Sequence, residues 1–200
     1  MIQSLRRLVL VMAFSGTVIS AWSPLEAQRS TAPAPQVPFE DADACPFEGC
    51  VYREWTAKSE VAIRTERRRS APVAFRLKAG EKITAVTGVV VTVKAGRVQF
   101  LEPRTLSTSN GPLHIVPGQT LYLLTYQGEG FTKAWFNGRL YQDVDAMDFL
   151  NGVCEINPTK CAGKVIEKSQ TEWWVQIRCK SGKVGWTNEP NQFDGKDALE

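Results

Sequence analysis

The sequence contains a single histidine, His114, in 200 residues, and this scarcity excludes several classes of protein. A zinc site built from histidines, or a reaction that needs a histidine pair, requires at least two of them. The 24 basic and 21 acidic residues give a net charge of only +3, with both signs spread along the chain. A dedicated nucleic-acid-binding protein concentrates positive charge on one face, so we expect no nucleic-acid partner.

A recognisable catalytic set is also missing. The serine-hydrolase motif G-x-S-x-G is absent, and His114 lies in an alternating stretch where a structural role is expected. Asp143, Asp145 and Asp148 have part of the spacing of a calcium loop, but Asp148 stands where that loop requires glycine. We therefore predict that the protein is not an enzyme and holds neither a cofactor nor a metal. Paired carboxylates for sugar hydrolysis remain an open alternative, because their separation is a property of the fold.

Long apolar runs are absent except at residues 8–19, which follow two arginines. This run is too short to span a bilayer and has the flanks of a secretory signal peptide. We predict a signal peptide over residues 1–27, removed after Ala27, with Ala21 as a second cleavage site and an uncleaved anchor as the alternative. The mature protein is then secreted or periplasmic, without membrane attachment.

Five cysteines follow the predicted signal peptide. Disulfides persist in oxidising compartments, and the close spacings of Cys45 with Cys50 and of Cys154 with Cys161 make both pairs disulfide candidates. Cys179 is left over and is expected to pack as a small apolar residue, although pairing with Cys154 or Cys161 stays open. A four-cysteine zinc site is the alternative, but the second pair has wider spacing than common zinc sites.

Residues 28–44 contain little that is apolar enough to bury. Pro33, Pro35 and Pro38 are followed by acidic residues, so we predict a disordered, proline-rich and acidic linker. The alternative is that the proline spacing lets this segment bind a groove elsewhere.

After Cys50 the apolar residues alternate with polar ones, which is the pattern of half-buried strands. The alternation is clearest at Val89–Val93, Leu121–Leu124 and Trp173–Cys179, and glycine turns separate the runs. At most Val144–Leu150 forms one short helix. The sequence therefore predicts an all-β protein.

The stretch Thr56–Val86 reads TAKSEVAIRTERRRSAPVAFRLKAGEKITAV, and the stretch Glu172–Phe193 reads EWWVQIRCKSGKVGWTNEPNQF. The first is similar to the opening half, and the second to the closing half, of bacterial Src-homology-3-like (SH3-like) domains. In the closing half, the positions of the family motif are occupied by Trp174, Ile177, Gly182, Gly185 and Trp186. The segment Pro117–Tyr141 looks like another copy of the middle strands, so the resemblance implies two tandem small β-barrels.

The resemblance also sets the expected boundaries. We place the first SH3-like barrel at residues 45–103 and the second at 104–195, with an insertion near 142–162 that contains one cysteine pair.

Four residues are candidates for ligand binding. In the last long run Trp174 and Arg178 alternate away from Val175, so both are expected on the outer face, where the resemblance implies a ligand groove. Tyr126 and Trp135 belong to a second aromatic cluster. Burial of Trp174 by another part of the chain, and core packing of the second cluster, are the alternatives. The run Arg67–Arg69 is expected to be a solvated loop tip.

The sequence thus predicts an exported, non-enzymatic binding module of the cell envelope. Its expected partner is peptidoglycan or an extended peptide segment of an envelope protein. A structural or inhibitory subunit that binds a protein partner is the alternative, followed by a cell-wall hydrolase.

Overall fold

The structure is a computed structural model that describes residues 33–157 and 161–198. The predicted signal peptide and the start of the predicted linker lie outside these residues. The elements, in chain order, are β1 (Phe39–Ala42), β2 (Glu54–Ala57), β3 (Val61–Arg64), β4 (Val73–Leu77), β5 (Lys82–Lys94), β6 (Gly96–Phe100), β7 (Arg104–Leu106), β8 (Leu113–Ile115), β9 (Thr120–Gly128), β10 (Phe131–Phe136), β11 (Arg139–Asp145), α1 (Met147–Leu150), α2 (Val153–Ile156), β12 (Gly163–Glu167), β13 (Gln170–Cys179), β14 (Val184–Thr187), the 3-10 helix η2 (Pro190–Gln192) and β15 (Phe193–Asp194).

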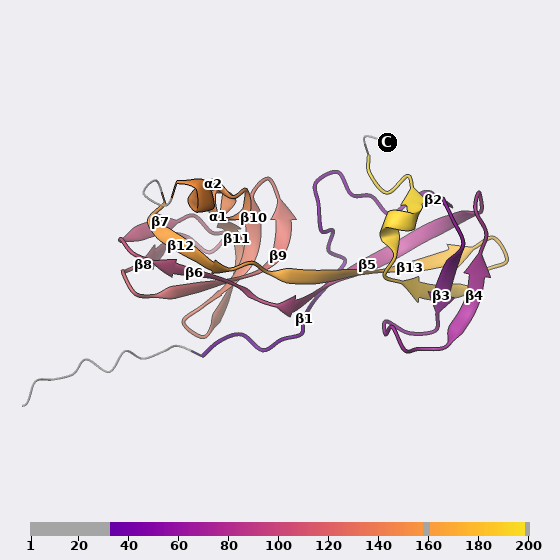
Figure 1. Cartoon of the computed structure of the whole chain (residues 1–200), viewed down its shortest axis with the longest axis horizontal. Helices are drawn as coiled ribbons and strands as arrows, with labels where there is room; N and C mark the ends of the chain where they lie inside the picture. The colour runs from indigo at the N-terminus through magenta and orange to yellow at the C-terminus, as the bar shows by residue number, and fades with distance from the viewer. Residues whose placement is uncertain (1–32, 158–160, 199–200) are drawn as a thin grey trace, which may run out of the picture. The chain divides into compact units, whose positions relative to one another are not determined.

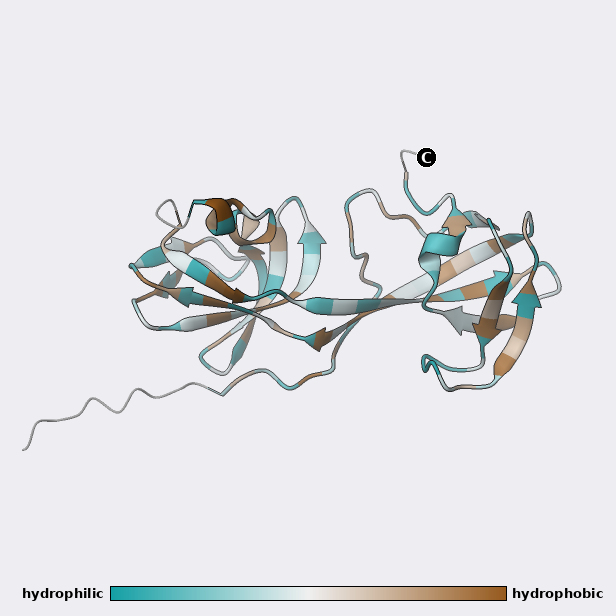
Figure 2. Cartoon of the chain, viewed as in Figure 1, coloured by the Kyte–Doolittle hydropathy of each residue, from teal (hydrophilic) through white to brown (hydrophobic). Residues whose placement is uncertain are grey.

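The prediction of an all-β protein is confirmed. Antiparallel strands form nearly all of the regular structure. Buried residues alternate with exposed residues along β6 and with half-buried residues along β10, as the sequence pattern requires. Figure 2 shows this alternation as changes between brown and teal along single strands. The two helices have one turn each, and neither has the length and apolar character that crossing a bilayer requires; this holds for the described residues.

The first sheet joins strands from both ends of the chain. Its order is β15-β2-β5-β13-β14-β3-β4, and β1 also pairs with β5. The longest pairing joins β5 and β13 and places Trp173 opposite Val90 and Ile177 opposite Ala85. A buried cluster centred on Trp55 and Phe193 lies against this sheet. The edge-to-face contact of Trp55 with Trp173, at 5.7 Å between ring centroids, ties β2 to β13.

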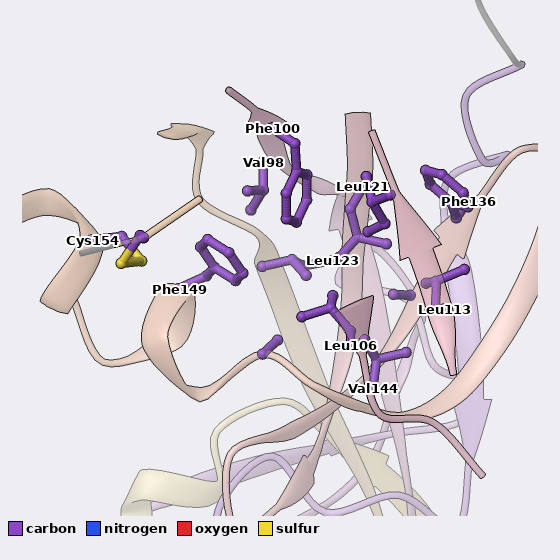
Figure 3. Close-up of a cluster of buried hydrophobic side chains, with 14 residues drawn as sticks. Val98, Phe100, Leu106, Leu113, Leu121, Leu123, Phe136, Val144, Phe149 and Cys154 are labelled. Carbon is purple, nitrogen blue, oxygen red and sulfur yellow. A yellow bond between two sulfur atoms is a disulfide. The ribbon is translucent and has the colours of Figure 1, made fainter. Parts of the chain in front are cut away.

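The second sheet has the order β11-β10-β9-β6-β12, and β7 pairs with β8 as a separate hairpin. Figure 3 shows its core, in which Phe100 and Phe149 meet edge to face with ring centroids 5.6 Å apart. Phe149 comes from α1, so the predicted insertion near 142–162 contributes to this core. The same figure shows the disulfide at Cys154 beside Phe149.

The boundary between the two sheets does not lie near Pro103, where the two barrels were expected to meet. Residues 96–167 supply the second sheet, and they lie in the sequence between β5 and β13, which pair with each other. Figure 1 shows β5 passing into β6 and β12 passing into β13. The predicted ranges 45–103 and 104–195 therefore differ from the observed sheets, because β13 shares its core with β2 and β3 rather than with β9 and β10, and β14 pairs with β13 and β3.

Part of the predicted disordered linker is a strand. Residues 39–42, within the range 28–44, form β1, which pairs with β5 from Phe39 opposite Thr92 to Ala42 opposite Val89. A segment with little apolar surface is ordered here because the exposed edge of β5 supplies its backbone hydrogen bonds.

Both predicted disulfides are confirmed. Cys45 is bonded to Cys50 and Cys154 to Cys161, while Cys179 has a free thiol and is half-buried. We expect the unreduced protein to take up one equivalent of iodoacetamide, on Cys179, and the reduced and unfolded protein to take up five. Mass spectrometry of the intact protein and of its peptides measures both numbers. Three adducts before reduction would contradict one of the two disulfides, because an unformed disulfide leaves two further thiols.

Candidate functional site

Trp174 does not lie open on the outer face. It does face away from the cluster around Trp55, as its position in the alternation predicts, but its side chain is only 3% exposed. Val89, which stands opposite Trp174 on β5, packs against it together with Val91 and Trp186. The indole therefore fills a separate small cluster on the outer face of the first sheet and offers no free ring for a ligand.

The arginine loop between β3 and β4 closes the same face. The guanidinium of Arg67 lies over the Trp186 ring, 5.4 Å from its centroid, and also pairs with Glu40 at 2.8 Å. Arg69 pairs with Glu172 at 3.0 Å, and that carboxylate also accepts a hydrogen bond from the indole of Trp174 at 3.1 Å. The expectation of a solvated tip is thus wrong for Arg67, which is half-buried between Trp186 and Glu40, whereas Arg68 and Arg69 are exposed as expected.

The predicted ligand-binding residues lie in two different sheets. Arg178 is exposed on β13 of the first sheet, four residues beyond the buried Trp174. Tyr126 on β9 and Trp135 on β10 belong to the second sheet, and both are half-buried. The structure therefore brings Tyr126 and Trp135 onto neighbouring strands and leaves Arg178 apart from them.

Trp135 lies on the outer face of the second sheet. Its neighbours along β10, Ala134 and Phe136, belong to the buried cluster, so alternation turns Trp135 away from the core. Tyr122 stands opposite it on β9 and Leu140 stands opposite it on β11. Residues that stand opposite one another on one face have neighbouring Cβ atoms, and Arg97 on β6 stands opposite Tyr122. We call the line formed by Leu140, Trp135, Tyr122 and Arg97 the aromatic row, after the two rings at its centre.

The strand that carries Trp135 also contacts the N-terminal segment of the described chain, at Pro33 and Asp41. The indole Nε1–H of Trp135 donates a hydrogen bond to the backbone carbonyl of Pro33 at 2.8 Å. Two residues along β10, the ammonium of Lys133 donates to Asp41 Oδ1 at 2.6 Å. The side chain of Asp41 is 8% exposed and that of Lys133 is 19% exposed, so water screens this ion pair far less than a surface pair. Neither Lys133 nor Asp41 belongs to a sequence motif, so no signal in the sequence marks this contact.

No family model, curated protein or solved structure matches this chain.

A cavity of about 540 Å³ adjoins the Lys133 contact. One wall is the loop closed by the Cys45–Cys50 disulfide, and the other is the β9–β10 turn with Tyr126 and Glu129. Among the described residues, no three histidine, cysteine or acidic side chains gather closely enough to hold a metal ion. The cavity is an acidic and aromatic recess, and the half-buried Tyr126 forms part of its wall.

The remaining titratable candidates have structural partners. His114 on β8 shares a hydrogen bond of 2.9 Å with Thr105, the residue opposite it on β7. A hydrogen bond from the Ser181 hydroxyl, 3.0 Å away, lowers the pKa of the Cys179 thiol below its ordinary value.

Tyr52 lies where the disulfide loop meets the first core. Its hydroxyl donates to the carbonyl of Ala44 at 2.7 Å and accepts from the indole of Trp173 at 3.1 Å. Burial raises the pKa of Tyr52 above its ordinary value, although the Trp173 hydrogen bond opposes this shift. The folded protein therefore favours the neutral phenol.

This shift predicts a pH-dependent difference between the wild type and Tyr52→Phe. Below the ordinary tyrosine pKa the full contribution of the phenol is present, and it is lost as pH rises through the higher pKa of the folded state. We expect Tyr52→Phe to lower the free energy of unfolding by about 1–2 kcal/mol at neutral pH, because two hydrogen bonds are lost. The difference in the free energy of unfolding between the wild type and Tyr52→Phe should become smaller above about pH 10. Urea unfolding of both proteins at the two pH values measures it, and a constant difference would contradict the raised pKa.

Proposed function

We propose that this protein is an exported, non-enzymatic module that binds an extended peptide segment of a cell-envelope protein. The observation that carries the proposal is the hydrogen bond from Trp135 to the carbonyl of Pro33. Aromatic surfaces that bind proline-containing segments use flat rings together with a donor for a backbone carbonyl, because prolines leave the carbonyls of an extended chain unpaired. Tyr122 and Trp135 supply the rings and Trp135 supplies the donor.

Export belongs to the same proposal. It rests on the signal-peptide features of residues 1–27 and fits the two disulfides, which persist in oxidising compartments. A relation to SH3-like domains is proposed only on the similarity of Thr56–Val86 and Glu172–Phe193. Because Trp174 is buried, the proposed ligand surface is the Trp135 row rather than the groove that the similarity implies.

Binding to fractionated envelope tests the proposal. Residues 28–200 are titrated against immobilised envelope proteins and, separately, against protein-free peptidoglycan sacculi. We expect retention on the protein fraction, weakened about tenfold by Trp135→Ala, because a ring and a donor are lost. Trp135→Phe keeps the ring and should weaken retention less. His114→Ala, an exposed change on β8, is the matched control and should have no effect.

The other outcomes separate the alternatives. Retention on sacculi alone would overturn the peptide assignment in favour of peptidoglycan. Time-dependent release of soluble wall fragments would identify a hydrolase. Retention that Trp135→Ala leaves unchanged would show that the aromatic row is not the binding surface.

A further inference from the structure

The N-terminal strap, which we define as residues 33–42, is attached to β10 at two points. Trp135 donates to the carbonyl of Pro33, and Lys133 donates to the carboxylate of Asp41. Trp135 and Lys133 are two residues apart on β10, and both alternate with buried residues, so they share the outer face of the sheet. The strap therefore contacts this face at Pro33 and contacts it again eight residues later, at Asp41.

Between these points the strap is bound mainly by its backbone. Its last four residues form β1, which adds antiparallel to β5 from Phe39 opposite Thr92 to Ala42 opposite Val89. The pairing continues for one more hydrogen bond, from the amide of Asp43 to the carbonyl of Gly88 at 2.8 Å. An edge strand held in this way is the arrangement by which sheets bind extended peptides.

The side chains of the strap contribute little to the core. Val37 is 46% exposed, Phe39 is half-buried, and no strap residue belongs to the three buried clusters that the described residues form. Both main cores are thus complete without the strap. The strap occupies its surface as a ligand would, through hydrogen bonds and charges.

Two adjacent acidic residues carry the charge recognition. Asp41 pairs with Lys133 at 2.6 Å, and Glu40 pairs with Arg67 at 2.8 Å. Neighbouring residues of a strand point to opposite sides, so each acidic side chain meets its own cation. The Lys133 ammonium is mostly shielded from water, and a segment without an acidic residue at this position would leave it buried and unpaired.

We infer that the surface beneath the strap accepts, in place of the strap, an extended segment of a partner protein that carries proline at its start and two acidic residues at its end. The segment adds antiparallel to β5, gives a carbonyl to Trp135 and gives a carboxylate to Lys133. This inference rests on the proposed function and names the class of partner. The strap is then a resident competitor, and a tethered competitor acts at an effective concentration of roughly millimolar.

A peptide exchange experiment tests the inference. The probe is a fluorescently labelled peptide with the sequence of the strap, PAPQVPFEDA, titrated by anisotropy into residues 28–200. In the variant Asp41→Lys the cis strap is repelled by Lys133, whereas in the matched control Gln36→Lys the same charge is placed on an exposed strap position. We expect the probe to bind Asp41→Lys at least about tenfold more tightly than it binds the wild type or Gln36→Lys.

A second probe reports the carboxylate contact. The same peptide with asparagine at the position of Asp41 should bind the Asp41→Lys protein about tenfold more weakly, because the charge-assisted bond to Lys133 is lost. The indole ¹H–¹⁵N resonance of Trp135 should shift on binding of either probe. Thermal unfolding of each variant verifies that the two cores are intact.

The outcomes separate the inference from the proposed function. If the probe binds Asp41→Lys and Gln36→Lys equally, or neither, the inference is wrong, whatever the envelope fractions show. If the strap peptide exchanges as expected but envelope proteins are not retained, the surface is as inferred and the proposed function fails. If Asp41→Lys is monomeric but the wild type sediments as a dimer that the probe dissociates, the occupant is a second copy and the partner assignment is overturned.

Discussion

Replacing Trp174 with alanine is expected to lower the free energy of unfolding by about 3–5 kcal/mol, the range measured for large aromatic residues removed from a core. The indole is 3% exposed, packs against Val89, Val91 and Trp186, and donates its N–H to Glu172. Alanine would leave a cavity and would remove a partner of the Glu172 carboxylate. Urea unfolding followed by far-UV circular dichroism measures the loss.

Arg178→Ala provides the comparison, because Arg178 is exposed on the same strand. A change there should alter the free energy of unfolding by less than about 0.5 kcal/mol. If Trp174→Ala were as mild as Arg178→Ala and nevertheless abolished retention on an envelope fraction, Trp174 would be a ligand-binding residue after all. The structure favours the first result, since Trp174 has no face left for a ligand.

The strands were predictable because their signal is local. In β13 the alternation of Val175, Ile177 and their neighbours is visible within ten residues, and it assigns the buried face correctly. The burial of Trp174 was not predictable in this way, because it depends on Val89 and Val91, which lie in a strand far away in the chain. Local periodicity states that a face is apolar but not which strand covers it.

The same reason explains the division of the sheets. Residues 96–167 form a sheet of their own and lie in the sequence between β5 and β13. No pattern in β5 or β13 indicates that the two strands pair across this long insertion. The closing motif forms the strand pair β13 and β14. The predicted range 104–195 groups this pair with the strands that precede it in the sequence, which is the commoner arrangement in β proteins, whereas β13 pairs with β5.

The candidate site was only half predictable. Trp135 was proposed from the density of aromatic residues, whereas Lys133 and Asp41 are ordinary residues whose meaning comes from the contact between them. The composition of residues 28–44 indicated disorder, since it offers little to bury. Backbone pairing with β5 outweighed that signal, and the alternative interpretation, a proline-containing segment bound elsewhere, agrees with the contact of Pro33 with Trp135.

Gly185→Ala is the second change for which we expect a large effect, a loss of about 2–4 kcal/mol in the free energy of unfolding. A Cβ at this position would lie 2.7 Å from the backbone carbonyl oxygen of Arg64 and 2.6 Å from a methyl group of Ile63. The next residue, Trp186, pairs with Arg64 across the β14–β3 contact, so the strands cannot separate without losing that pairing. Glycine is therefore needed before Trp186 because β3 passes too close for any side chain.

A nearby glycine supplies the control for this prediction. Gly182 has a positive φ of 85°, but a Cβ at this position would meet no atom within 4 Å, so glycine is favoured here by the backbone conformation rather than by lack of space. Asparagine tolerates this backbone conformation, and Gly182→Asn should cost less than about 1 kcal/mol. Chemical unfolding of the two variants, with the chemical shifts of the β3 amides as a local probe, compares them. Equal stabilities would mean that β3 can retreat from β14 without cost and that the close approach does not stabilise the first sheet.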